Sequence, residues 1–277
     1  MKLSFSTLGC PKWTIDEICA AGKRLGYQGI EIRGIKGEFD LTKIDALSEK
    51  NRKATVEKFR DAGLEMVMLG SSCKFTSRDP GDRGANLRDA QAAVDIAHAT
   101  GTKMIRVFGG RIDEGTEKED AYSWVVENLQ ALGDYARSAN VTIAVESHDD
   151  FTDTEVLRMV LDRIGRENVG VLWDVSNSYR SGTKTIAQCW ADLRPYAVHT
   201  HFKDSYLEPS ERLGYRYCLM GDGDVPNFDA VKILEDANYR GYLSLEWEKA
   251  WHPDIDEPEI VFPQYIKKMR EYLQKLG

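Results

Sequence analysis

Residues 198–204 read Val-His-Thr-His-Phe-Lys-Asp, a run in which two histidines and a lysine share one side of an extended chain. Three further runs consist of mostly apolar residues that end in a carboxylate. They read Thr-Ile-Ala-Val-Glu at 142–146, Val-Gly-Val-Leu-Trp-Asp at 169–174 and Tyr-Leu-Ser-Leu-Glu at 242–246. A carboxylate beside buried strand residues is costly unless a cation or hydrogen-bond donors meet it. The four runs therefore predict strands whose last side chains converge on a shared partner.

The rest of the chain repeats the same unit, a short apolar run followed by a longer amphipathic stretch. The strand candidates are Leu3–Thr7, Gly29–Arg33, Glu65–Leu69, Met104–Gly109, Thr142–Glu146, Val169–Asp174, Val198–Phe202 and Tyr242–Glu246. The helical patterns are Thr14–Leu25, Lys53–Ala62, Asn86–Ala99, Tyr122–Ser138, Asp153–Ile164, Lys184–Leu193, Phe228–Ala237 and Pro258–Leu276. Eight such pairs without a flexible linker predict an α/β fold, a single (β/α)8 TIM barrel that forms one domain over residues 1–277.

Local signals support these boundaries. Thr14 followed by Glu17 predicts a capping box at the start of the first helix, and Gly63 predicts the end of the second. An open, doubly wound sheet is the alternative fold, but residues 7–11, Thr-Leu-Gly-Cys-Pro, do not form the glycine-rich turn that such sheets usually carry. The longest connection is Lys203–Asn227, and loops of this length are often functional.

The composition narrows the classes of function. The chain has 277 residues, 42 % hydrophobic and 30 % charged, with a formal net charge of -8, which argues against nucleic-acid and membrane partners. Neither a bilayer-spanning run nor a signal peptide is visible. Five scattered cysteines, an odd number, indicate reduced thiols and a cytoplasmic protein. The sequence leaves open whether the chain forms a homo-oligomer.

The predicted strand ends supply a set of metal ligands. In a barrel the C-terminal strand ends meet at one mouth, where active sites lie, and the last four strands are neighbours. Their ligand residues are Glu146, Asp174, His201 and Glu246. Three carboxylates and one imidazole suit Mn²⁺ best, with Mg²⁺, Co²⁺ or Zn²⁺ as alternatives. Scattered helix caps and surface ion pairs are the competing interpretation.

Several segments resemble the xylose-isomerase-like TIM-barrel superfamily, in its sugar phosphate isomerase/epimerase branch. The similarity covers nearly the whole chain, and is carried by residues 4–11, 26–33, 105–110, 199–204 and 245–248. It implies one divalent metal bound by Glu146, Asp174, His201 and Glu246. It also implies that Glu146 and Glu246 move protons, as the matching pair does in ketose 3-epimerases.

One position departs from that pattern. Related epimerases often have a histidine three residues after the strand-six aspartate, and here Asn177 follows Asp174 at that distance. An amide can hydrogen-bond a hydroxyl group but cannot titrate near neutral pH. Because of Asn177, epimerase activity does not transfer directly from the resemblance. We expect His148 to supply the imidazole instead.

Other residues near the predicted mouth have two interpretations each. Lys203 either polarises a substrate oxygen or forms a salt bridge to Asp204 or Glu248. Glu248 follows strand eight and is expected to wall the site. The predicted substrate-binding residues are therefore His148, Asn177, Lys203 and Glu248. Arg106 is expected to pair with a barrel carboxylate, either Glu31 or Glu146, and His199 to lie one layer deeper than His201.

The sequence predicts an enzyme that acts on a small-molecule sugar. The first hypothesis is a divalent-metal-dependent isomerase or epimerase of a monosaccharide or keto-sugar derivative, which moves a proton through a metal-bound enediolate. The alternative is a metal-dependent lyase or dehydratase that eliminates a β-leaving group from a keto sugar, 3-keto-glycoside or keto acid. An abasic-site endonuclease is disfavoured because the chain has only five histidines and is acidic. A non-catalytic binder is disfavoured because it has little need for two buried glutamates.

Overall fold

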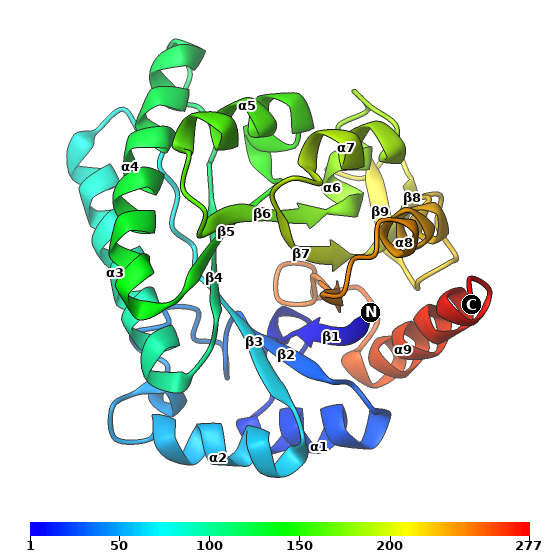
Figure 1. The fold of residues 1–277 in the computed structure, drawn as a ribbon. Helices are drawn as coiled ribbons and strands as arrows, with labels where there is room; N and C mark the ends of the chain where they lie inside the picture. The colour runs from blue at the N-terminus through cyan, green and yellow to red at the C-terminus, as the bar shows by residue number, and fades with distance from the viewer.

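The structure, a computed structural model that describes residues 1–277, contains a closed barrel of eight parallel strands surrounded by helices (Figure 1). Around the barrel the strands follow the order β1-β10-β7-β6-β5-β4-β3-β2. Their bounds are β1 Lys2–Ser6, β2 Gly29–Ile32, β3 Glu65–Gly70, β4 Met104–Phe108, β5 Thr142–Glu146, β6 Val169–Asp174, β7 Ala197–Phe202 and β10 Tyr242–Leu245. This arrangement confirms the predicted (β/α)8 barrel and excludes the doubly wound sheet.

Nine α-helices lie outside the strands, eight of them at the predicted positions. Their bounds are α1 Ile15–Leu25, α2 Arg52–Ala62, α3 Pro80–Thr100, α4 Lys118–Ala139, α5 Thr154–Ile164, α6 Val175–Arg180, α7 Ile186–Leu193, α8 Asn227–Asp236 and α9 Pro258–Gln274. Short 3₁₀ turns occupy Thr7–Gly9, Asp45–Leu47 and Asp149–Phe151. The capping box is present, since Thr14 Oγ1 accepts from the Glu17 amide and the Glu17 carboxylate accepts from the Thr14 amide. Gly63 ends α2 at φ 72°, as predicted.

Helix α3 begins earlier than the sequence pattern predicted. Its first turn has Asp79 as the N-cap, whose carboxylate accepts from the Gly81 amide, and Pro80 at the first helical position. Residues 80–85 contain no large apolar side chain and none of them is buried, so the apolar periodicity that predicted the helix starts only at residue 86. The capping residues, rather than the hydrophobic pattern, place this boundary.

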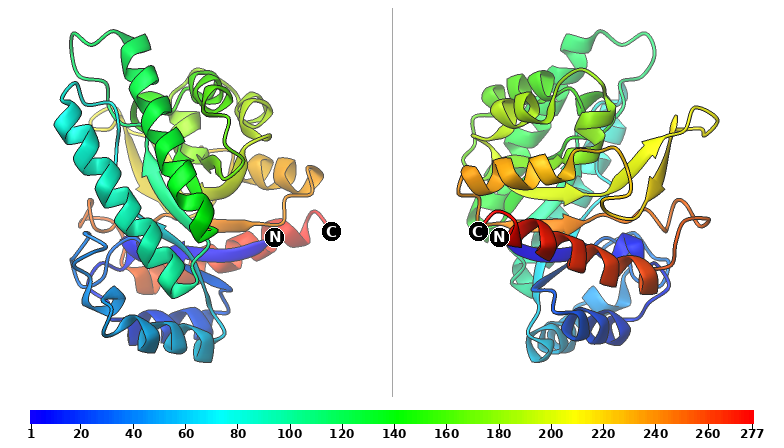
Figure 2. Two further views of the ribbon diagram at one scale, coloured as in Figure 1. Left: turned by 60° about the vertical axis from the view of Figure 1, so that its left-hand side comes forward. Right: turned by 90° about the vertical axis from the view of Figure 1, so that its right-hand side faces the viewer.

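The connection Lys203–Asn227 contains structure that was not predicted. It forms an antiparallel hairpin of β8, Asp204–Leu207, and β9, Tyr215–Cys218. In the right-hand view of Figure 2 this yellow hairpin extends from the end of the barrel opposite the two termini. Strand β1 begins at the termini, so the hairpin lies at the C-terminal strand ends, where it walls the barrel mouth. It was missed because it lies outside the barrel and has no run of buried apolar residues.

Side chains fill the space between strands and helices with one large apolar cluster, which extends from Leu3 to Met269. All five cysteines are free thiols, as expected from their spacing. None of the helices combines the length and the apolar character that a membrane span requires. Inside the barrel, by contrast, many buried residues are polar or charged, and these residues form the candidate site.

Candidate metal centre

The four predicted metal ligands meet at the C-terminal end of the barrel. Glu146 ends β5, Asp174 ends β6, His201 lies in β7 and Glu246 directly follows β10. These strands are adjacent, and the register pairs Asp174 with His201. One ligand atom from each residue lies within 4.8 Å of the others, and all four side chains are buried. The barrel therefore brings three carboxylates and one imidazole to a single point.

The hydrogen bonds around this point leave ligand atoms unsatisfied. Glu146 Oε1 and His201 Nδ1 are buried and have no hydrogen-bond partner. Asp174 Oδ2 has only the Lys203 ammonium, at 2.9 Å and outside hydrogen-bond geometry. Buried polar atoms in native proteins are usually satisfied. A divalent cation would satisfy all three atoms, so the residues present fit a metal that takes oxygen ligands and one nitrogen.

A second carboxylate orients the predicted histidine ligand. His201 Nε2 lies 2.9 Å from Glu31 Oε2, while its Nδ1 faces Glu246 at 3.3 Å and Glu146 at 3.7 Å. The other Glu31 oxygen bonds His199, one layer deeper in the barrel, as expected for that histidine. Burial raises the pKa of Glu31, but the charges of His201 and His199 lower it more strongly, so the net pKa is well below its usual range. A histidine that binds a metal through one ring nitrogen commonly donates a hydrogen bond from its other ring N–H to such a carboxylate.

Sequence reasoning missed this role of Glu31. It placed Glu31 among two candidate partners of Arg106, and the structure gives Arg106 to Glu146 instead. The available signal was an acidic residue within the apolar strand Gly29–Ile32, which requires a buried partner.

We predict that Glu31→Ala lowers the affinity for Mn²⁺ by about 10- to 100-fold, because His201 loses the group that fixes its orientation. Titration of the metal-free protein with Mn²⁺ in a calorimeter measures this change. Glu65→Gln, at a half-exposed carboxylate on β3, is the matched control and should leave the affinity unchanged. If a folded Glu31→Ala protein bound Mn²⁺ with wild-type affinity, Glu31 would have no role in orienting the metal ligand His201.

Two buried cations lie among the carboxylates. Arg106 bonds Glu146, approaches Glu246 Oε1 at 3.9 Å and covers the ring of Phe108. Lys203 Nζ lies 2.6 Å from Glu246 Oε2, 2.8 Å from Glu248 Oε1 and 2.9 Å from Asp174 Oδ2. The carboxylates thus take part in ion pairs, which offset the cost of their burial. Those ion pairs still leave the unsatisfied atoms of Glu146 and His201 facing the same point.

Three of the four predicted substrate-binding residues, His148, Asn177 and Glu248, line one cavity of about 470 Å³. The four ligand residues are buried and do not line it, but each of these three side chains is close to one of them in sequence or through a bonded neighbour; we call this part of the lining the inner wall. Lys203 does not line it and is only 1 % exposed, so the structure places it behind Glu248 as a support for the carboxylates. Of the two salt-bridge partners considered for Lys203, Glu248 is the one observed.

His148 and Asn177 are each held by a neighbour. His148 Nδ1 lies 3.1 Å from Asp149 Oδ2, a charge contact without hydrogen-bond geometry. Burial lowers the pKa of His148, but the carboxylates of Asp149 and Glu146 together raise it more, so the net pKa is above its usual value. Asp149 has a φ of 50°, a left-handed conformation that aspartate tolerates better than most residues. The backbone N–H of Asn177 donates to Asp174 Oδ1 at 2.7 Å, and its side-chain amide donates to the Ser147 carbonyl at 3.4 Å.

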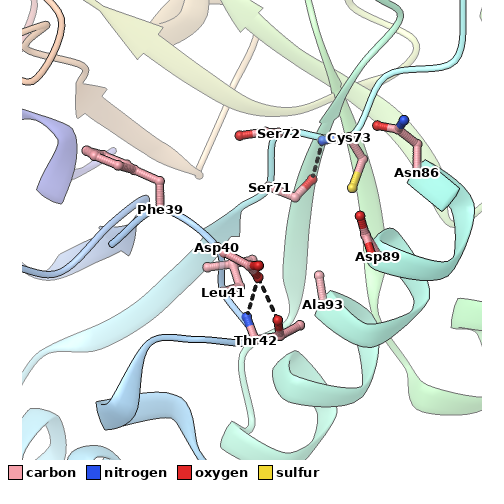
Figure 3. A pocket seen from close by; sticks show the side chains of 10 residues that line it. All are labelled: Phe39, Asp40, Leu41, Thr42, Ser71, Ser72, Cys73, Asn86, Asp89 and Ala93. Atoms are coloured by element: carbon pink, nitrogen blue, oxygen red, sulfur yellow. Dashed lines mark hydrogen bonds between the residues drawn. The ribbon is translucent and has the colours of Figure 1, made fainter. Parts of the chain in front are cut away.

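Another cavity, of about 290 Å³, lies between the connection after β2, the residues that follow β3 and helix α3 (Figure 3). Some of its polar groups are bonded to one another: Asp40 accepts from Thr42, and Ser71 accepts from the Cys73 amide. It holds neither of the two groups of side chains that could bind a metal ion. The larger cavity, lined by His148, Asn177 and Glu248, is therefore the better candidate for the substrate.

Comparison with known proteins gives one family and a consistent fold. The family model described as xylose isomerase-like TIM barrel matches residues 19–274. An inosose dehydratase of Erwinia tasmaniensis is 25 % identical over 99 % of this chain and 97 % of its own length. The D-psicose 3-epimerase of Clostridium cellulolyticum H10 superposes with a TM-score of 0.79 at 14 % identity, with full coverage of both chains. A xylose isomerase-like TIM barrel protein from Mycobacterium smegmatis in complex with magnesium gives a TM-score of 0.74 at 15 % identity, covering 100 % of this chain and 98 % of that one.

Proposed function

Because this chain belongs to the xylose isomerase-like TIM barrel family, we propose that it is a divalent-metal-dependent lyase of keto sugars or keto polyols. The reaction removes the proton next to the ketone and expels an oxygen leaving group from the next carbon. The observation that carries this proposal is the buried four-residue centre, three of whose ligand atoms have no hydrogen-bond partner and whose neighbours His148, Asn177 and Glu248 line an open cavity. A cation bound there would polarise a ketone and acidify the adjacent C–H bond.

Several residues are proposed to act at the C–H bond next to the ketone. Glu146 is proposed as the base, because Glu246 is held more fully by its neighbours: its Oε2 lies 2.6 Å from Lys203 Nζ, and its Oε1 faces His201 at 3.3 Å. Arg106 and Lys203 hold the two glutamates in place.

The cavity wall is proposed to serve the leaving group. His148 lies on the wall beside Glu146, where Asp149 orients it to protonate the departing oxygen. Asn177 and Glu248 are proposed to hold substrate hydroxyl groups.

Two observations favour elimination over epimerisation. Asn177 occupies the position where related epimerases often have a histidine, and of the two histidines that line the cavity, His148 and His252, His148 is two residues from Glu146. The Erwinia relative that matches along almost its whole length is named for a dehydratase, a reaction that expels water.

Epimerisation remains the second candidate because Glu146 and Glu246 both face the centre from different strands. One glutamate would then take the proton and the other would return it on the opposite face. This scheme needs Glu246 to act as an acid or base while it bonds Lys203 at 2.6 Å.

Product analysis separates the two reactions. We expect the Mn²⁺-loaded protein to convert an inosose or 3-keto-D-glucose into an unsaturated keto product that has lost water, seen by NMR and by a mass loss of one water. A product of unchanged mass and inverted configuration would instead establish the epimerase. Protein treated with a chelator is the control, and it should give neither product.

Substrate charge gives a further prediction. Asp204 accepts from the amides of Gly221 and Gly223, at 2.7 and 3.3 Å, so the glycine-containing loop after β7 already has a carboxylate on the N–H groups that could bind phosphate. We therefore predict an unphosphorylated substrate. In competition kinetics the phosphorylated form of a keto sugar should have a kcat/KM no higher than that of the free sugar. A clear preference for the phosphate ester would overturn this prediction.

A further inference from the structure

The outer part of the substrate cavity is built differently from its inner wall. Tyr215 and Tyr217 of the hairpin face Trp251 and His252 of the loop after β10, and we call these four side chains the aromatic annex. All four line the 470 Å³ cavity and also an adjoining pocket of about 180 Å³. The 470 Å³ cavity therefore adjoins a second pocket, and aromatic rings form the wall that the two share.

Trp251 is placed like a binding platform rather than a core residue. One face packs on Phe39, with ring centroids 4.7 Å apart, while 50 % of the residue is exposed. Phe39, which comes from the connection after β2, and the Arg33 guanidinium, 5.8 Å from the ring centroid, hold the Trp251 ring while half of the residue stays exposed. On the other wall of the annex, Tyr217 packs edge-on against His252 at 5.2 Å. Aromatic rings that are held in place and still have exposed surface are suited to stack on another ring.

The charges around the annex favour a neutral ligand. Arg180 pairs with Asp224, Arg216 with Glu211 at 3.5 Å, and Arg111 lies 3.9 Å from Asp149. Burial and the charge of Glu248 raise the pKa of Tyr217 well above its usual value, so its phenol stays protonated and can donate to a hydroxyl group. Arg212 and Asp254 line the smaller pocket without an ion pair, but their charges are opposite, so the wall offers aromatic surface and a hydrogen-bond donor rather than a patch of one charge.

We propose that the annex binds a second ring attached to the keto sugar, so that the substrate is a neutral keto-glycoside and the second ring is its leaving group. This inference rests on the proposed lyase function. Glu248 links the two spaces, since it lines the cavity and bonds Lys203, which contacts Glu246. A sugar ring held against His148, Asn177 and Glu248 would point its substituent at Trp251.

The elimination is balanced without a further reactant. For a 3-keto-glycoside, the proton on C2 passes to Glu146, and the electron pair of that C–H bond forms the C1=C2 double bond. The C1–O bond breaks, and its oxygen takes the bonding pair and one proton from His148. The products are an unsaturated keto sugar and the alcohol of the second ring.

The test compares substrates that differ only in that ring. We expect the Mn²⁺-loaded wild type to prefer phenyl 3-keto-β-D-glucoside or 3-keto-cellobiose over methyl 3-keto-β-D-glucoside by about 10-fold in kcat/KM. The phenyl and disaccharide substrates show whether the annex takes an aryl group, a sugar or both. Trp251→Ala should abolish the preference, and Trp251→Phe should keep most of it. Tyr206→Ala, at an exposed aromatic residue of the hairpin that does not line the cavity, should behave as wild type.

Binding measurements separate this inference from the proposed reaction. Phenyl β-D-glucoside and cellobiose have no ketone and cannot react, so calorimetry with them tests the annex alone. Tighter binding than methyl β-D-glucoside, lost in Trp251→Ala, supports the annex even if no lyase activity is found. Equal binding and equal kcat/KM for all three glycosides overturns it. If 3-keto-D-glucose is still dehydrated in that case, the proposed function stands without the annex.

Discussion

Replacement of Glu246 by alanine should weaken Mn²⁺ binding by more than about 100-fold, because a lost ligand should exceed the 10- to 100-fold cost of losing an outer-shell partner. The substitution removes one of the four donor residues, and it leaves Lys203 paired only with Asp174 and Glu248. Lys203 then neutralises more of the Asp174 charge, which reduces the attraction for a cation further. Calorimetric titration of metal-free protein, with elemental analysis of the loaded protein, measures both affinity and stoichiometry.

Glu248 provides a matched control for this experiment. Its carboxylate bonds the same lysine, at 2.8 Å, but is not among the four side chains that meet at the centre. Glu248→Ala should therefore change Mn²⁺ affinity far less than Glu246→Ala. Equal, stoichiometric binding by wild type and Glu246→Ala would remove Glu246 from the ligand set.

Glu146→Gln should lower kcat by about 1,000-fold at a Mn²⁺ concentration that saturates the variant, because general-base catalysis typically contributes factors of this order. Glutamine keeps the size of the side chain and one oxygen for a metal, but it cannot accept the substrate proton. Saturation with Mn²⁺ must be verified, since the same substitution also removes a charged ligand. The measurement is steady-state turnover of an inosose or 3-keto-D-glucose.

The variants Glu146→Gln and Glu246→Gln should differ in how much they still exchange the substrate α-proton with solvent. If Glu146 is the base, Glu246→Gln retains some exchange of the substrate α-proton with D₂O, whereas Glu146→Gln shows none. The reverse result would assign the base to Glu246. Equal exchange in both variants would contradict a single-base elimination and favour proton transfer by another group.

The sequence predicted the barrel and its four convergent side chains for a clear physical reason. Runs of buried apolar residues that end in Glu146, Asp174 and Glu246 require a partner for each carboxylate, and parallel strands place those ends at one mouth. The strand register that puts Asp174 beside His201 then follows from the fold. The assignment of a metal to this point, and of manganese as that metal, stays a prediction.

Features that depend on side-chain packing could not be predicted in the same way. The hairpin β8–β9 has no buried strand pattern, and the helix α6 begins with Asp174 as its N-cap, so a predicted ligand also caps a helix. The position of Lys203 behind Glu248 depends on the lengths of both side chains. Glu31 contacts His201 across the barrel, although the two residues are 170 positions apart in the sequence. No local sequence pattern encodes such a contact.

The central claim is that the centre formed by Glu146, Asp174, His201 and Glu246 uses a divalent metal to remove a proton beside a ketone. Its most direct test is proton NMR in D₂O of an inosose and of 3-keto-D-glucose with metal-free and Mn²⁺-loaded wild type. The account predicts loss of the α-proton signal with the loaded protein, no loss with the metal-free protein, and recovery on adding Mn²⁺. Loss of the α-proton signal at the same rate without metal, or turnover by the loaded protein to a product that keeps the α-hydrogen of the substrate, would contradict it.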